Sequence, residues 1–162
     1  MRLWQAILAV TVAVFAVQLA APGIEGMLGL TATAALSGAF WQFVTYLFIH
    51  GDLLHIGFNM FAFLIFAPAV EEALGNRKFG ALYFLSGIGS ALLFIAITGI
   101  VDELLIGASG AVFGVLAAYG VLFPKHKILL YGVVPVPALL AVFGFAALEI
   151  VFGVTGAQPG IA

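Results

Sequence analysis

The sequence predicts an all-α, polytopic membrane protein: a bundle of transmembrane helices in a single domain. Of 162 residues, 65% are hydrophobic and only 7% are charged, whereas soluble domains carry about 25% charged residues. Several apolar runs also approach the ~20 residues needed to cross a bilayer. We expect about five spans, with residues 1–162 forming one membrane domain and no internal repeat.

The composition excludes several functional classes. The chain has no cysteine, which rules out disulfides and thiolate metal sites. Its five Lys and Arg residues and net charge of −2 provide no basic patch for nucleic acid. The first apolar run is longer than the apolar core of a signal peptide and has no A-x-A cleavage site, so we read it as a retained span.

The expected spans follow the uncharged apolar runs, and prolines, glycines and charges separate them. They are residues 3–20, about 53–70, roughly 79–100, 109 to about 123, and about 137–152. Pro135 and Pro137 favour an irregular entry into the fifth span. Residues 22–52 are rich in aromatic side chains, which favour the membrane interface, so we expect short helices there at headgroup level.

The basic residues indicate the orientation. All five lie before the first span, between the second and third, or between the fourth and fifth: Arg2, Arg77, Lys78, Lys125 and Lys127. The positive-inside rule therefore places the N-terminus in the cytoplasm. We expect an integral, multi-pass protein of a bacterial cytoplasmic membrane.

The fourth span is short. Residues 109–123 reach about 22 Å as a helix, and Pro124 fixes their cytoplasmic end. Residues 104–108 must then enter the membrane as non-helical backbone, which is tolerated only inside protein or beside water. Ser109 is thus predicted at the floor of a small cavity open to the outside.

Small residues surround this serine. Gly107 and Gly110 allow a tight turn and close approach to the hydroxyl. Gly110, Gly114 and Ala118 form a stripe at four-residue spacing, suited to close helix packing. The alternative interpretation is that the stripe only packs and that Ser109 is the N-cap of its helix.

Two polar residues share one face at the outer end of the second span. His55 and Asn59 lie four residues apart, and polar residues within spans usually face the interior. A serine, an imidazole and a carboxamide at similar depth are the set that acyl transfer uses, a nucleophile with donors for an oxyanion. They could instead form hydrogen bonds between helices and nothing more.

These motifs together resemble the rhomboid family of intramembrane serine proteases. The resemblance covers nearly the whole chain and follows its order: Trp41-Gln42-Phe43-Val44-Thr45-Tyr46 with Phe48 and His50, His55-x-x-x-Asn59, the Gly75 and Arg77 turn, and Gly107-Ala108-Ser109-Gly110. The ordered combination is specific, although Gly-x-Ser-Gly alone is weak.

The resemblance implies a function for each matched residue. Ser109 would be the nucleophile that attacks a peptide carbonyl of a substrate helix near the outer membrane face. His55, Asn59 and the backbone N–H of Ser109 would stabilise the oxyanion, and Gly107 and Gly110 would shape the active-site loop. The implied partners are transmembrane protein substrates and the lipid bilayer, with no metal, cofactor or nucleic acid.

The chain also departs from the family. The family's general base is a histidine on a sixth span that packs against the Gly110 and Gly114 face, and no residue of this sequence matches it. We therefore expect residues 1–162 to be inactive alone and to need a C-terminal segment that supplies the sixth helix. The family's Trp-Arg pair is also missing, because Trp41 has no arginine beside it.

Other assignments remain open. His126 lies on the cytoplasmic side, too far from Ser109 to act as its base, and His50 is expected to brace the interfacial loop. A Ser109–His55–Asn59 triad is a further alternative. Two alternative functions are also open. The chain could be a catalytically silent rhomboid-like protein that binds transmembrane helices, or a transport subunit with a path lined by His55, Asn59 and Glu149.

Overall fold

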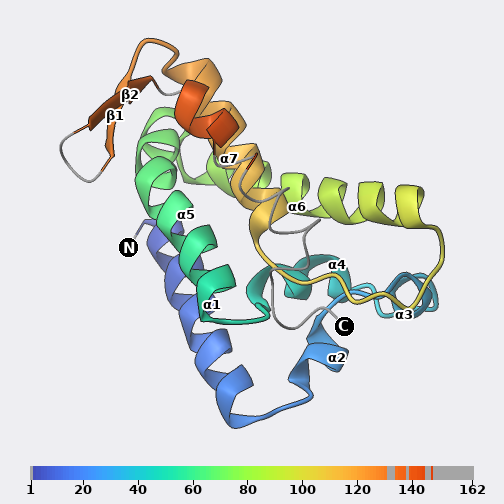
Figure 1. The fold of residues 1–162 in the computed structure, drawn as a ribbon. Coiled ribbons are helices and arrows are strands. Elements are labelled where there is room, and N and C mark those ends of the chain that lie inside the picture. Colours follow the sequence, from blue (N-terminus) through green and yellow to red (C-terminus); the bar gives the residue numbers. More distant parts are fainter. Residues whose placement is uncertain (1, 131–133, 138, 145–146, 148–162) are drawn as a thin grey trace.

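The computed structural model describes residues 2–130, 134–137, 139–144 and 147. Within these residues, three helices are long and apolar enough to cross a membrane. They are α1 (Leu3–Ala20), α5 (Leu53–Leu74) and α6 (Asn76–Thr98). A shorter apolar helix, α7 (Ser109–Leu122), packs against both α5 and α6 (Figure 1). The all-α helical architecture predicted from composition is confirmed.

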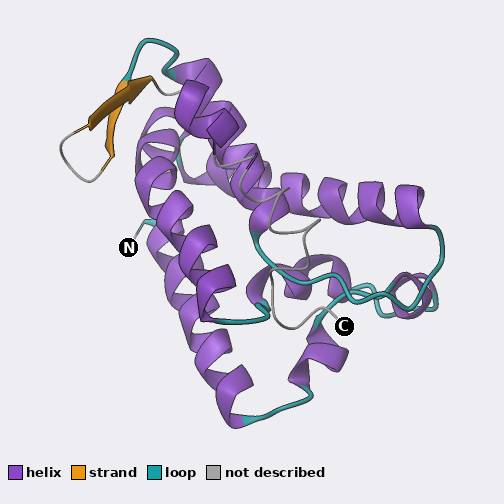
Figure 2. Cartoon of the chain, viewed as in Figure 1, coloured by secondary structure: helices purple, strands orange, loops and turns teal. Residues whose placement is uncertain are grey.

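The segment between α1 and α5 folds into the expected short helices. These are α2 (Ile24–Leu28), α3 (Ala32–Leu36), α4 (Gln42–Thr45) and the 3₁₀ helix η1 (Tyr46–Phe48). The Thr31 hydroxyl accepts the Ala34 N–H and so caps α3. Loops join these pieces to the longer helices, as Figure 2 shows.

The helix boundaries depart from the prediction at the turn between α5 and α6. The first span has the predicted bounds, but α5 continues through Glu71 and Glu72 to Leu74, and α6 begins at Asn76. The break falls at Gly75, whose φ of 78° suits glycine. The sequence prediction ends the span at the two glutamates, yet one of them is buried inside the helix bundle.

The start of the predicted fifth span is wrong. Pro137 ends a strand, because β1 (Lys127–Leu130) and β2 (Val134–Pro137) pair as an antiparallel hairpin. Both strands of this hairpin are edge strands, and an edge strand tolerates proline, which lacks an N–H. The two prolines of β2, Pro135 and Pro137, are two positions apart. Residues 139–144 are helical. Apart from Ala147, the rest of the predicted span, including Glu149, lies outside the described residues.

The core forms where α7 packs against α5 and α6. Large side chains fill it, and two pairs of aromatic rings make edge-to-face contacts. The ring centres of Phe63 and Tyr83 lie 5.5 Å apart, and those of Phe66 and Tyr119 lie 5.0 Å apart. Phe63, Phe66 and Tyr83 are fully buried. This core holds the C-terminal half of α7 against the middle of α5.

A buried carboxylate anchors the start of α1. Glu71 of α5 is 2% exposed, and its two oxygens accept the backbone N–H groups of Leu3 at 3.0 Å and Trp4 at 2.6 Å. These N–H groups have no partner within α1 and lie at its positive end. The carboxylate therefore joins α1 to α5 through charge-assisted hydrogen bonds.

We predict that Glu71→Ala destabilises the bundle far more than Glu72→Ala. The first change leaves two buried donors unpaired and should lower the free energy of unfolding by about 2–4 kcal/mol. The second removes only the exposed 3.5 Å pair with Arg2, worth less than about 1 kcal/mol. Unfolding in mixed detergent micelles measures both, and equal losses would refute this account of Glu71.

Candidate active site

A non-helical segment leads into α7. Residues 99–108 lie between α6 and α7 without forming a helix. Leu105 exchanges two backbone hydrogen bonds with Leu30, of 3.0 and 2.8 Å, and the Gly107 N–H donates to the Tyr46 carbonyl at 3.0 Å. The Ala108 N–H donates to Nε2 of His50 at 3.4 Å. Each contact ties this segment to the region between α1 and α5.

Ser109 is the first residue of α7, and the N-cap position belongs to Ala108. No side chain caps this helix, so the interpretation of Ser109 as an N-cap is wrong. The first intrahelical bond runs from Val112 N–H to the Ala108 carbonyl. The N–H groups before it, including that of Ser109, lie at the positive end of the helix, where a developing negative charge is stabilised.

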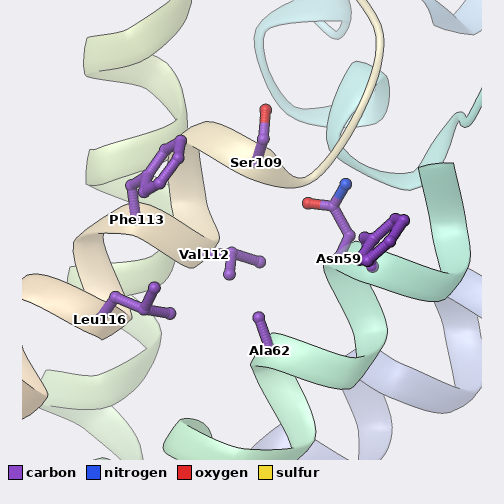
Figure 3. Close-up of a pocket in the computed structure, with 7 residues that line it drawn as sticks. Asn59, Ala62, Ser109, Val112, Phe113 and Leu116 are labelled. Atoms are coloured by element: carbon purple, nitrogen blue, oxygen red, sulfur yellow. The ribbon is translucent and has the colours of Figure 1, made fainter. Parts of the chain in front are cut away.

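Ser109 and Asn59 line the same cavity. Its volume is about 10 Å³, room for about one water molecule. Figure 3 shows the Asn59 carboxamide, on α5, near the turn that carries Ser109. The remaining lining is apolar: Phe58, Ala62, Val112, Phe113 and Leu116. Ser109 and Asn59 thus line one cavity with otherwise apolar walls, and the Ser109 side chain points away from Asn59 in Figure 3.

The Asn59 side chain has one satisfied end and one open end. Its Nδ2 donates to the His55 carbonyl at 3.0 Å, one turn earlier in α5. Its Oδ1 is buried without a hydrogen-bond partner among the described residues. A buried polar atom left unpaired costs about 1–3 kcal/mol, which indicates a position shaped for something other than stability.

His55 lies against Gly107. A Cβ atom added at Gly107 would come within 2.6 Å of Nε2 of this imidazole, and the φ of Gly107 is +113°. His55 Nδ1 accepts the Gly51 N–H at 3.4 Å. A neutral imidazole that accepts at Nδ1 carries its proton on Nε2. His55 therefore presents a donor to the turn that precedes Ser109.

His50 is fully buried, at 1% exposure, and links α1 to the active-site loop. The Gln18 carboxamide of α1 pairs with its backbone, accepting its N–H and donating to its carbonyl at 3.1 Å each. The rings of His50 and His55 meet edge to face at 5.0 Å. His50 thus connects Gln18 to Ala108, the residue before Ser109.

Gln18 is a positioning residue that the sequence interpretation missed. Its signal was present, since an amide near the end of an apolar span usually faces the interior. Gln18 forms two hydrogen bonds with the backbone of His50, 32 positions later in the chain. Sequence periodicity does not reveal a pairing over this separation.

Electrostatics keep His50 neutral. Burial lowers its pKa from 6.5 to about 3, and the neighbouring His55 imidazole acts in the same direction while Asp52 opposes both. Since Nε2 accepts from Ala108, the neutral ring carries its proton on Nδ1. His50 is therefore an acceptor for the loop and does not supply charge to the site.

Gly110 and Gly114 lie against α6. A Cβ at Gly110 would overlap the side chain of Ser90, and one at Gly114 would overlap that of Ser86. The absence of a side chain at these positions allows α6 and α7 to approach closely. The resemblance to the family places a sixth span on this face, whereas in the described part of the chain α6 occupies it.

His126 lies at the other end of α7. Its ring stacks on Phe123 at 4.7 Å, and its Nδ1 is 3.5 Å from the Tyr119 hydroxyl. Ser109 is the first of the 14 residues of α7 and His126 follows the helix end, so the helix alone sets them about 20 Å apart along its axis. No group of three or more potential metal ligands occurs among the described residues.

The burial of His50 predicts an acid-sensitive fold. The unfolded chain binds a proton on this imidazole near its ordinary pKa of 6.5, but the folded chain does so only near 3. Between these values the unfolded state binds more protons, so stability falls as pH is lowered through that window. The free energy of unfolding, measured near neutral pH and at about pH 5, should show this slope.

Two variants separate His50 from other titrating groups. His50→Gln should flatten the slope, since glutamine can still accept the Ala108 N–H but does not titrate. His126→Gln changes an exposed histidine and should leave the slope as it is. A slope that is as steep in His50→Gln as in the unchanged chain would refute the assignment.

The sequence is similar to that of known proteins. A family model described as the Rhomboid domain matches residues 37–162. The chain is 36% identical over 84 residues to "Putative rhomboid protease YdcA" of Bacillus subtilis, covering 51% of this chain and 41% of that protein. It is 42% identical over 95 residues to "Rhomboid protein 1, mitochondrial" of Saccharomyces cerevisiae, covering 56% and 27%. "Rhomboid protease AarA" of Providencia stuartii is 30% identical over 97 residues, covering 52% and 34%. The chain thus spans less than half the length of these relatives.

Proposed function

This chain belongs to the rhomboid family, and we propose that it is an intramembrane serine endopeptidase that cleaves transmembrane helices of other membrane proteins near the outer membrane face. One observation carries the proposal. Ser109, at the uncapped start of α7, shares a cavity with Asn59, while His55 packs on the turn two residues before it.

The chemistry assigned to these residues is acyl transfer. The Ser109 hydroxyl attacks a peptide carbonyl carbon of the substrate helix, its proton passes to a base, and the carbonyl oxygen becomes an oxyanion. The proposed donors to that oxyanion are the Ser109 N–H, the Nε2–H of His55 and the second Nδ2–H of Asn59, since Nδ2 gives its other hydrogen to the His55 carbonyl. Donors already held in place within apolar surroundings stabilise such a charge without reorganisation.

We assign the general base to a histidine other than the three of this chain. His126 is at the far end of α7, and His50 is engaged with Ala108. His55 Nδ1 already accepts from Gly51, and its Nε2 is assigned as an oxyanion donor. A serine without a base is a weak nucleophile, so residues 1–162 alone should react slowly, and a segment supplying the sixth helix should restore the rate.

The cleavage side rests on charge placement. Ser109 lies at the end of the bundle opposite Arg2 and Arg77, and the positive-inside rule puts those basic residues in the cytoplasm. We place the protein in a bacterial cytoplasmic membrane, in which the substrate helix would be cut near the outer face. Bacterial relatives support this placement, and relatives from yeast and plants also match.

We predict that a fluorophosphonate labels Ser109 when a sixth-helix segment from a rhomboid relative is supplied. Ser109→Ala should abolish labelling, because the nucleophile is lost. Ser37→Ala, an exposed serine at the end of α3, should leave it unchanged. Asn59→Ala should slow labelling by about 10²-fold or more, as loss of an oxyanion donor does.

The same assay separates the protease from its nearest alternative. A rhomboid-like protein that binds helices without cleaving them would leave Ser109 unlabelled even with the added segment. Labelling that survives Ser109→Ala would place the nucleophile elsewhere.

We further predict that Gly107→Ala slows labelling at least tenfold while the fold persists. The added methyl group would displace the His55 imidazole and would sit at a positive φ, a strain of about 1–3 kcal/mol. Gly99→Ala is the matched control, since Gly99 has a φ of +81° and no atom near its Cβ position. Equal effects of the two variants would show that backbone strain alone, and not the His55 contact, sets the rate.

A further inference from the structure

A second cavity lies at the opposite end of the bundle from Ser109. It is a groove of about 520 Å³ between the N-terminal ends of α1 and α6, within the range of small-molecule sites. The two helices approach closely at this point, because a Cβ at Gly80 would come within 2.8 Å of the Leu3 side chain. Gly80 therefore allows α1 and α6 to touch where both line the groove.

The groove is amphipathic. Its mouth is polar and positively charged, with Arg2, Asn76 and Arg77. Its floor is formed by apolar and small residues: Leu3, Ala6, Gly80 and Ala81. A complementary ligand has an anionic end and a hydrocarbon end, and this combination describes a phospholipid better than a soluble metabolite.

The charges at the mouth are available. Arg77 is exposed and has no hydrogen-bond or ion-pair partner in the part of the chain that the structure describes. Arg2 contacts Glu72 at 3.5 Å, but their side chains are 53% and 74% exposed, and such a pair contributes little. Glu71 is occupied by the N–H groups of α1. Glu72 is thus the carboxylate that an anion bound at Arg2 would displace from its pair.

The membrane setting points to the same ligand. The basic residues at this end mark it as cytoplasmic, and the cytoplasmic leaflet carries the anionic lipids. Basic pockets between transmembrane helices on that side bind anionic headgroups. The groove lies between two such helices, with its arginines at one end and its apolar floor along them.

We propose that this groove binds one anionic phospholipid, with its phosphate at Arg2 and Arg77 and an acyl chain along the apolar floor. The site lies at the far end of the bundle from Ser109 and does not depend on the proposed proteolysis. Its occupant would add contacts to both α1 and α6 beside the one that Leu3 and Gly80 already make.

The test is lipid binding to the full chain by native mass spectrometry, with phosphatidylglycerol and phosphatidylcholine of identical acyl chains. We expect a single phosphatidylglycerol to bind at least several-fold more tightly than phosphatidylcholine. Arg77→Gln should weaken phosphatidylglycerol about fivefold, the value of one basic residue at an anionic headgroup. Lys78→Gln is the matched control, since Lys78 is adjacent and exposed but does not line the groove.

A second pair of variants tests the apolar floor. Ala81→Leu should fill the groove and weaken both lipids, whereas Ala96→Leu places the same side chain at an exposed position near the other end of α6 and should not. Equal binding of the two lipids, or equal effects of Arg77→Gln and Lys78→Gln, would overturn the proposal. So would displacement of the lipid by inorganic phosphate alone, because that outcome identifies a small-anion site.

Discussion

The structure depends on one constraint: backbone polar groups at membrane depth must find partners inside the protein. Within residues 104–108, Leu105 pairs with the Leu30 carbonyl and N–H, Gly107 donates to the Tyr46 carbonyl and Ala108 donates to Nε2 of His50. Those partners hold the loop in place, so α7 can begin at Ser109. The short α7, its uncapped start and the cavity beside Asn59 all follow from this arrangement of partners.

Buried side-chain polar groups also form hydrogen bonds between separate parts of the bundle. Glu71 fixes one end of α1 to α5, and Gln18 fixes the other end to the backbone of His50. The Tyr46 hydroxyl donates to the Gly87 carbonyl of α6 at 2.7 Å. Hydrogen bonds between buried groups are strong because water does not compete with them, so the loop that carries the serine is fixed from three helices.

The sequence predicts what depends on local pattern. The bounds of α1 and the first residue of α7 follow from apolar runs and flanking glycines. The end of α5 does not, because Glu71 looks like a terminating charge until its partners on α1 are known. The hairpin of β1 and β2 escapes prediction for a similar reason, since two prolines exclude a helix without specifying a strand. The partners of Gln18 and His50, and the contacts of α7 with Ser86 and Ser90, require tertiary structure.

The proposed site also contains features that lower the stability of the fold. Of the four buried side-chain polar atoms without partners among the described residues, two belong to His50 and Asn59. Gly107 adds a left-handed φ directly against His55. A helix-packing role for Ser109 would need none of these features, and each one costs stability. Departures of this kind are expected where a site serves chemistry, which agrees with the role proposed for Ser109.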